Sequence, residues 1–396
     1  MQKIVLSEPL RTAIGIFGGA LKDISAVSLG TEVVKEIMSR TSLPPEQVDD
    51  CVMGNILGAG QGQNPARQVS INSGLKVETP AITVNRLCGS GLQSVVLAAQ
   101  AIKSGDCECI VAGGMESMST APYYLRKARW GYKMSAPSDE VVDGILCDGL
   151  MDAFNGYHMG VTAENLAEKY GISRERQDEF AYSSQMKAKV AIEGGRFVSQ
   201  IVPISVPGRK GNSIQFDVDE HPRPGVTLER ISELKPVFKK GGTVTAANSS
   251  GINDGAAALI VTSESKAEKL GLIPIASIKS YAVCGVDPSV MGIGPVPAMR
   301  MALDRADLCI DDINLVELNE AFAAQSLAVL SDFPIAQDRL NVNGGSIALG
   351  HPVGATGAVL LVKLLHEFKN IHPGGYGMVS LCMGGGMGIA MIVEKM

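Results

Sequence analysis

Two cysteines, a histidine and an asparagine stand beside glycine-rich or strand-ending turns in this sequence. Cys88 lies in "NRLCGSGLQS", Asn319 in "ELNEAFA", His351 in "GGSIALGHPVGATG" and Cys382 in "LCMGGGMG". A cysteine thiolate can attack a carbonyl carbon and hold an acyl group, and an imidazole can accept the thiol proton near neutral pH. A second thiol can move a proton on a substrate. The set therefore predicts covalent transfer of an acyl group through a cysteine.

Backbone groups and an amide could stabilise the charge that such chemistry creates. Glycine runs let backbone N–H groups approach an oxygen that becomes negative, which makes an oxyanion hole. Asn319 follows the apolar run 315–318 and offers a side-chain N–H to a second oxyanion or to a water. Structural interpretations remain open, because a lone histidine or a glycine run often serves packing alone. Asn319 could also cap the helix that "EAFAAQSLAVL" predicts.

The element that holds Cys88 is a strand, a turn and a helix. Residues 81–84 are typical of a buried strand, and residues 92–102 carry apolar side chains at helical spacing. The thiol would then point at a helix N-terminus, where unpaired N–H groups and the helix dipole favour negative charge. We therefore expect a thiolate that forms easily at Cys88. The alternative is a buried cysteine in a tight turn.

The elements that position these residues occur twice along the chain. Each half runs strand, helix, "VN"-glycine turn, helix and strand, which predicts a duplicated α/β unit with mostly parallel sheets and helices outside. If the halves are related by a pseudo-twofold axis, the turns carrying the two cysteines and the histidine meet at strand ends, where open α/β sheets place their sites. The paired segments are 49–57, 82–102 and 109–117 in the first half, and 313–330, 340–365 and 377–393 in the second.

Residues 120–249 interrupt this repeat and predict an inserted loop domain. The first core half then comprises residues 1–119 and 250–270, and the second comprises residues 271–396. Basic residues gather in and near the insert, where they could receive an anionic ligand or form a solvated surface. They are Arg196, Arg209, Lys210, Arg223, Arg230, Lys235, Lys239 and Lys240.

Composition argues against several classes of protein. The net charge of -6 argues against general nucleic-acid binding. The eight cysteines are scattered and suit a reducing cytosol, the N-terminus lacks a signal-peptide pattern, and no membrane span is expected. Gly89, Gly91 and Ser94 give a weak dinucleotide-binding pattern, G-x-G-x-x-S, whereas a P-loop motif is absent.

The four motifs, together with "DAFNGYHMGVTAENLA" (152–167) and "NSSGINDGAAA" (248–258), resemble the thiolases of the short-chain biosynthetic type. The resemblance covers essentially the whole chain. It implies a duplicated core of two similar α/β halves, layered α-β-α-β-α, with a loop domain for coenzyme A binding and tetramerisation. It also implies a reversible Claisen condensation of two acetyl-CoA molecules to acetoacetyl-CoA and CoA, through an acetyl-cysteine.

The resemblance implies a role for each catalytic candidate. Cys88 resembles the nucleophile, and His351 resembles the residue that activates it and helps to stabilise a thioester oxyanion. Cys382 resembles the acid/base that removes the α-proton of the second acetyl-CoA. Asn319 resembles the residue that holds a water in that oxyanion hole. The backbone N–H groups of Cys88 and Gly384 resemble the second hole.

Further residues resemble contacts to the acyl-CoA substrate. His158 and Met159 resemble residues beside the pantetheine arm, and Arg223 and Ser250 resemble contacts to the nucleotide and pantetheine. Arg230 departs from a well-known biosynthetic member, which has a small polar residue there, so the adenine-side contacts stay open. The remaining candidates for the groove and the acyl pocket are Leu150, Phe238, Met291, Ala321 and Phe322.

The resemblance also implies assembly and location. No cofactor or metal is expected, because coenzyme A thioesters are substrates. Residues 126–134 resemble the segment that pairs dimers, so we expect a cytoplasmic homotetramer built as a dimer of dimers. The alternatives are a ketoacyl-synthase-type enzyme, which would need a second histidine at Asn319, a nicotinamide-binding dehydrogenase and a non-catalytic lipid carrier. The sequence does not determine the direction, pathway, chain-length limit or a reversible Cys88–Cys382 disulfide.

Overall fold

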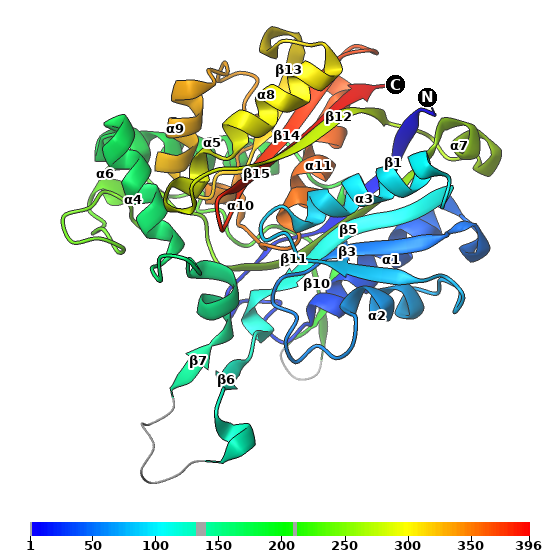
Figure 1. Cartoon of the computed structure of the whole chain (residues 1–396), viewed down its shortest axis with the longest axis horizontal. Coiled ribbons are helices and arrows are strands. Elements are labelled where there is room, and N and C mark those ends of the chain that lie inside the picture. The colour runs from blue at the N-terminus through cyan, green and yellow to red at the C-terminus, as the bar shows by residue number, and fades with distance from the viewer. Residues whose placement is uncertain (1, 132–139, 209–211) are drawn as a thin grey trace.

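One large sheet runs through the protein, whose computed structural model describes residues 2–131, 140–208 and 212–396 (Figure 1). Its two halves join where β1 and β12 pair at Val5–Ser277 and Leu6–Ala276. In sheet order the strands are β13 (Ile313–Leu318), β14 (Tyr376–Met383), β15 (Met387–Lys395), β12 (Ala276–Gly285), β1 (Ile4–Thr12), β11 (Asn253–Ser263), β5 (Cys109–Ser117), β3 (Asp50–Gly54) and β4 (Ala81–Val84).

The two halves of the sheet repeat one topology. In the first half β3 pairs in parallel with β4 and β5, and β11 pairs antiparallel with β5 and β1. In the second half β13 pairs in parallel with β14, and β15 pairs antiparallel with β14 and β12. The counterpart of β4 is reduced to one parallel bridge between Val316 and Leu340. The duplicated α/β fold is confirmed.

The expectation of mostly parallel sheets is wrong. The glycine turn at residues 384–386 joins β14 to β15 directly, and a turn that short can connect only antiparallel strands. In the first half β11 follows the loop domain and enters between β5 and β1 in the opposite direction to both. Each half is therefore a mixed sheet.

Helices form three layers around the sheet halves (Figure 1). In the middle layer α3 (Ser90–Ser104) and α11 (Thr356–Glu367) share one apolar core with strands of both halves. The outer face of the first half is covered by α1 (Ala26–Thr41) and α2 (Pro65–Asn72). The outer face of the second half is covered by α8 (Pro295–Ala306) and α9 (Ala323–Asp332). This is the expected α-β-α-β-α layering. The shorter elements are β2 (Gly15–Ile16), α7 (Glu264–Leu270) and α10 (Ser346–Leu349).

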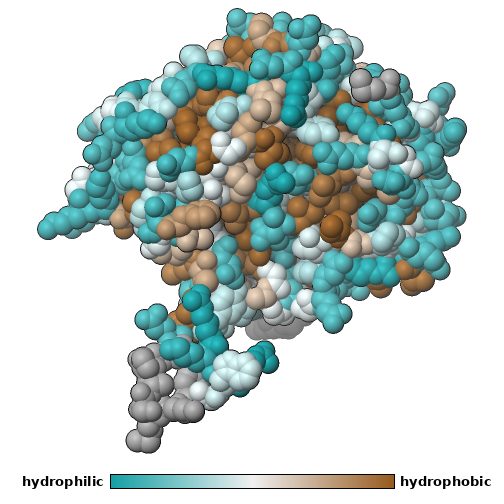
Figure 2. Space-filling model, in the orientation of Figure 1, coloured by the Kyte–Doolittle hydropathy of each residue, from teal (hydrophilic) through white to brown (hydrophobic). Residues whose placement is uncertain are grey.

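The segment between β5 and β11 forms the insert. The buried ion pair Arg11–Asp219, 2.7 Å long, ties it to β1, and Asp219 also accepts the Ile14 N–H. A hairpin projects from the body in Figure 1, and the space-filling view in Figure 2 shows it standing clear of the rest of the surface. The domain limits remain predictions, and Arg209, Lys210 and residues 132–134 lie outside the described residues. The insert contains β6 (Tyr123–Leu125), β7 (Val141–Asp143), α4 (Met159–Tyr170), α5 (Arg174–Glu193), β8 (Ile201–Val202), β9 (Ile204–Pro207), β10 (Ser213–Phe216) and α6 (Leu228–Ser232).

Strand β4 forms where the sequence predicts a strand, but the expectation that it is buried is wrong. It is the last strand of the sheet, and Ile82 is 49% exposed. An edge strand carries backbone groups that can pair with another chain. In the described part of the chain, no helix has both the length and the apolar character needed to cross a membrane.

Candidate active site

Cys88 lies in the sharp turn between β4 and α3. Leu87, just before it, has a φ of +48°, a left-handed conformation that is uncommon for a residue with a side chain and often marks functional sites. The Ser90 hydroxyl fixes the turn, because it donates to the Leu87 carbonyl and accepts the Arg86 N–H. A side chain at Gly89 would overlap the Met383 sulfur. A larger residue at this position would therefore have to displace Met383.

The expectation of an easily formed thiolate at Cys88 is wrong. Burial raises the pKa of the Cys88 thiol to about 11, against the opposing effect of a hydrogen bond from the Gly384 backbone. The nearby N-terminus of α3 does not outweigh the loss of water. A neighbouring base must therefore take the proton before Cys88 can act as a nucleophile.

His351 is a suitable base, and its hydrogen bonds fix its tautomer. Its Nδ1 lies 2.6 Å from the Thr356 hydroxyl, which itself donates to the Pro352 carbonyl. With the Thr356 proton on the Pro352 carbonyl, we assign His351 Nδ1 as the donor and Nε2 as the proton acceptor. Burial lowers the pKa of His351 to about 4, so the ring is neutral at physiological pH. The residue lies in the loop before α11, as the sequence predicts.

Cys382 lies at the end of β14, buried and close to the first thiol. Burial raises its pKa, and the proximity of Cys88 raises it further. It packs in an apolar cluster with Met159, Met291 and Phe322. The structure thus places two protonated thiols near enough to influence each other, one of them packed among apolar side chains.

Asn319 follows β13, and its side chain has one unused donor. Its Oδ1 accepts the Ser346 hydroxyl at 2.6 Å, whereas its buried Nδ2 has no hydrogen-bond partner among the described residues. Helix α9 begins at Ala323 with Phe322 as its N-cap residue, so Asn319 does not cap it. An unsatisfied buried N–H is costly, so this one is suited to hold a water or a substrate oxygen.

Most of the predicted substrate contacts lie in one apolar cluster. The His158 ring stacks on Phe238 with centroids 4.6 Å apart, and Phe238 meets Phe322 edge to face. The Ser250 N–H donates to the Ala321 carbonyl at 2.9 Å and joins segment 243–250 to the residues after Asn319. Met159, Met291, Ala321 and Phe322 pack with Cys382, whereas Leu150 packs beside Cys88.

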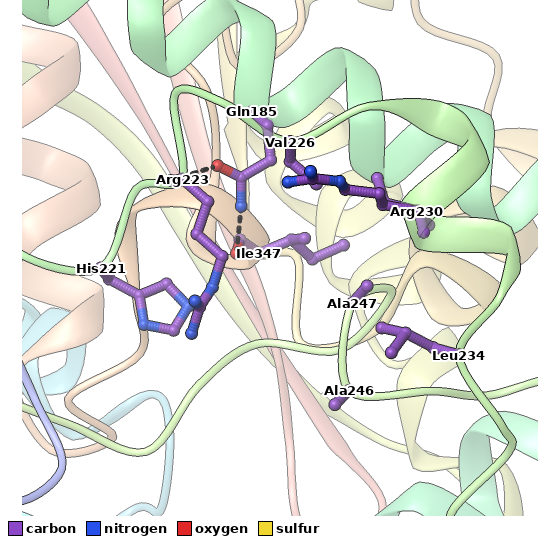
Figure 3. A pocket seen from close by; sticks show the side chains of 10 residues that line it. Gln185, His221, Arg223, Val226, Arg230, Leu234, Ala246, Ala247 and Ile347 are labelled. Carbon is purple, nitrogen blue, oxygen red and sulfur yellow. Dashed lines mark hydrogen bonds between the residues drawn. The ribbon is translucent and has the colours of Figure 1, made fainter.

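Arg223 is not part of this cluster and lines a pocket of about 350 Å³ (Figure 3). Arg230 and His221 line the same pocket, and the Arg223 N–H donates to Gln185 at 2.9 Å. Two guanidinium groups on one pocket favour an anionic ligand. Arg230, the position at which the sequence departs from the biosynthetic thiolase, is part of the wall of this pocket.

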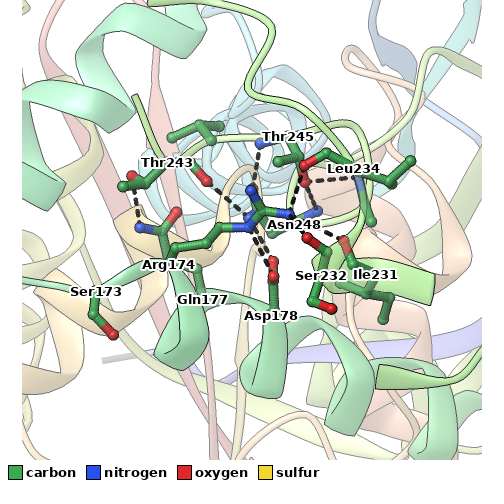
Figure 4. Close-up of polar contacts among 12 residues, drawn as sticks. Ser173, Arg174, Gln177, Asp178, Ile231, Ser232, Leu234, Thr243, Thr245 and Asn248 are labelled. Carbon is green, nitrogen blue, oxygen red and sulfur yellow. Dashed lines mark hydrogen bonds and ion pairs between the residues drawn. The ribbon is translucent and has the colours of Figure 1, made fainter. Parts of the chain in front are cut away.

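A network on α5 holds two walls of this pocket (Figure 4). Arg174 bonds to Asp178 at 2.7 Å and donates to the carbonyls of Ile231 and Leu234. The other oxygen of Asp178 accepts the Asn248 amide at 2.9 Å. The network therefore fixes both α6 and the segment 243–250 against α5.

The sequence did not single out several polar residues that hold these loops. The buried carboxylate of Glu116 accepts the N–H groups of Ile56, Leu57 and Gly354, which joins the first half to the His351 loop. Burial raises its pKa to about 7, and the three N–H donors oppose that shift. The sequence signal for Glu116 was an acidic residue at the end of the apolar strand "CIVAGGMES". The sequence analysis also did not single out four other polar residues that support these loops, which are Thr356, Ser346, His221 and Asn253.

Comparisons with known proteins agree over the full length. The chain is 53% identical to the acetyl-CoA acetyltransferase of Cupriavidus necator, with 100% of both chains covered. It also resembles the crystal structure of the Bacillus anthracis acetyl-CoA acetyltransferase, with a TM-score of 0.96 and 43% identity over 100% and 99% of the chains. For human mitochondrial 3-ketoacyl-CoA thiolase in complex with CoA, the TM-score is 0.94 with 44% identity over 100% and 98%.

Both halves of the chain match the same family. The thiolase N-terminal domain matches residues 4–265, and the thiolase C-terminal domain matches residues 272–395. Together the two domains account for nearly the whole sequence, including every turn that carries a candidate catalytic residue. The chain therefore belongs to the thiolase family.

Proposed function

We propose that this chain is an acetyl-CoA C-acetyltransferase, which condenses two acetyl-CoA molecules reversibly to acetoacetyl-CoA and CoA. The observation that carries the proposal is a set of four buried groups: the thiols of Cys88 and Cys382, which influence each other electrostatically, a neutral His351, and Asn319 Nδ2, which has no hydrogen-bond partner among the described residues. The names of full-length relatives support the substrate. The pocket at Arg223 and Arg230 supports a ligand with phosphate groups.

In the first half-reaction Cys88 is acetylated. His351 Nε2 takes the Cys88 proton, and the sulfur attacks the thioester carbonyl. The N–H groups of Cys88 and Gly384 stabilise the oxyanion that forms. The bond to the coenzyme A sulfur then breaks, and that sulfur takes the proton of Cys382. The site is left with acetyl-Cys88, protonated His351 and a Cys382 thiolate.

In the second half-reaction a new acetyl-CoA enters. The Cys382 thiolate takes its α-proton, and the enolate oxygen receives hydrogen bonds from His351 and from a water held by Asn319 Nδ2. The enolate carbon attacks the acetyl group on Cys88, which forms acetoacetyl-CoA. The released Cys88 sulfur regains its proton from His351, so all groups return to their starting states. These steps need no metal or redox cofactor.

The direct test is to incubate the protein with acetyl-CoA alone and separate the products by chromatography. We expect acetoacetyl-CoA and free CoA in equal amounts, and the reverse reaction from those two compounds. A folded protein that performs neither reaction would contradict the proposal and favour the lipid carrier. A requirement for an acyl carrier protein would favour the ketoacyl-synthase alternative, and tight NADH binding would favour the dehydrogenase.

Asn319→Ala is expected to lower kcat for condensation about 100- to 1,000-fold. The variant removes a buried N–H donor directed at the enolate oxygen through a water, and loss of one oxyanion donor typically has this cost. Initial rates of acetoacetyl-CoA formation measure the effect. Asn370→Ala, at an exposed asparagine, is the matched control. Activity near that of the wild type would remove Asn319 from the mechanism.

We propose that the chain assembles into a homotetramer, a dimer of dimers. The β6–β7 hairpin projects from the body and exposes large apolar side chains, including Leu125 at 52% and Trp130 at 82%. Such surfaces mark protein contacts, and the β4 edge could join the chains of each dimer. The double variant Leu125→Ser, Trp130→Ser is expected to sediment as a dimer, where the wild type sediments as a tetramer. A wild-type monomer, or a variant that stays tetrameric, would contradict this assembly.

We also propose that the protein works in the cytoplasm. All eight cysteines, including Cys88 and Cys382, are free thiols, which suits a reducing compartment.

A further inference from the structure

His221 lies between the Arg223 pocket and the loop that carries His351. Its ring lines the pocket beside Arg223 (Figure 3). On the other side its Nδ1 lies 3.3 Å from the Asn253 side-chain amide, and the backbone of Ile347 is near enough to raise the pKa of the ring as a hydrogen-bond partner. One side chain thus contacts both the pocket and the support of the catalytic loop.

Asn253 connects His221 to the backbone of the catalytic histidine. It is fully buried at the start of β11, and its Oδ1 accepts the His351 N–H at 2.8 Å. Its Nδ2 donates to the Gly15 carbonyl at 2.9 Å and faces His221 Nδ1. A Cβ at Gly350, whose φ is +103°, would lie 2.6 Å from the Asn253 side chain. The loop backbone is therefore pressed against Asn253.

The His221 ring is neutral in this position. Burial and, to a smaller extent, the Arg223 charge lower its pKa to about 4. A neutral imidazole has one acceptor nitrogen and one donor nitrogen. Nδ1 can accept the Asn253 amide proton while the other nitrogen donates to the Ile347 carbonyl. Both bonds therefore form at once without a charge beside the His351 loop.

We propose that His221 is a positioning residue, which holds the 344–351 loop through Asn253 and Ile347 so that His351 stays directed at Cys88. The loop is held at two points, Ile347 and the His351 N–H, which lie before and after the C-terminal end of α10. Two points fix the direction of the loop as well as its position. The inference rests on the proposed function, because it depends on His351 as the base for Cys88.

The test separates loop positioning from ligand binding by the choice of substrate. His221→Ala is expected to slow single-turnover acetylation of Cys88 about tenfold, since small misplacement of a catalytic group is costly. The same tenfold loss is expected with acetyl-CoA and with S-acetylpantetheine, which has no nucleotide to fill the Arg223 pocket. His221→Gln can keep one donor and one acceptor and is expected to recover most of the rate. His372→Ala, at an exposed histidine, is the matched control.

Each outcome decides the proposal. A loss with acetyl-CoA but not with S-acetylpantetheine would mean that His221 only binds the nucleotide, and would overturn it. An equal loss in His221→Gln would also overturn it. If His221→Ala does not fold, His221→Phe keeps the ring volume, lacks both nitrogens and carries the same expectation. Wild-type turnover of acetyl-CoA is measured alongside, so a failure of the proposed function is seen separately as an inactive wild type.

Discussion

Cys88→Ser is expected to lower kcat for condensation and for thiolysis by about 10,000-fold or more, the scale seen when a catalytic nucleophile is removed. A serine hydroxyl holds its proton far more tightly than a thiol. The site already raises the pKa of the Cys88 thiol to about 11 by burial, so nothing in it would compensate for the weaker acid. Both directions should fail together, because both pass through the acyl-enzyme.

The measurement is rapid mixing with acetyl-CoA, acid quench and peptide mass analysis. The wild type is expected to carry one acetyl group on the peptide that contains Cys88, and the variant none. Cys309→Ser, at an exposed cysteine, is the control and should keep both the acetyl group and the rate. An acetyl group on another cysteine, in an active wild type, would assign the nucleophile elsewhere.

Cys382→Ser is expected to lower condensation about 1,000- to 10,000-fold while acetylation of Cys88 is slowed far less. Loss of a positioned acid/base group typically costs up to this amount. Cys382 must take the α-proton of the second substrate, whereas water or solvent-borne acid can protonate the coenzyme A that leaves in the first step. The same rapid-quench experiment gives the acetylation rate, and steady-state formation of acetoacetyl-CoA gives the condensation rate.

The ratio of the two losses decides the role of Cys382. An equal fall in both half-reactions would mean that the residue supports the fold near Cys88 and takes no proton. Cys284→Ser is the matched control, because its partly buried thiol lies on β12, separated from β14 by β15, and is not in the apolar cluster around Cys382. It should leave both rates unchanged.

The sequence by itself determined the local units and their order. Three local units follow from residue spacing over about twenty positions or fewer: the strand, turn and helix around Cys88, the helix after His351, and the strand that carries Cys382 near its end. The repeat of these units predicted the duplicated core. Local geometry is set by nearby residues, so these features could be read without the fold.

The tertiary structure decided the properties that depend on surroundings. Burial raises the pKa of the Cys88 thiol and keeps His351 neutral. The sequence showed only the helix N-terminus beside Cys88, which suggested that its thiolate would form easily. Strand β11 is antiparallel to its neighbours because the chain re-enters the sheet after the loop domain. Strand β4 is exposed because it lies at the edge of the sheet.

The link between pocket and catalytic loop likewise arose only in three dimensions. His221 and Asn253 are 32 positions apart, and Asn253 is 98 positions from His351. Each is an ordinary polar residue in its own segment, so no local pattern marks it. Desolvation and long-range hydrogen bonds are properties of the assembled core, which is why the sequence identified the reacting groups but only the fold showed what holds and tunes them.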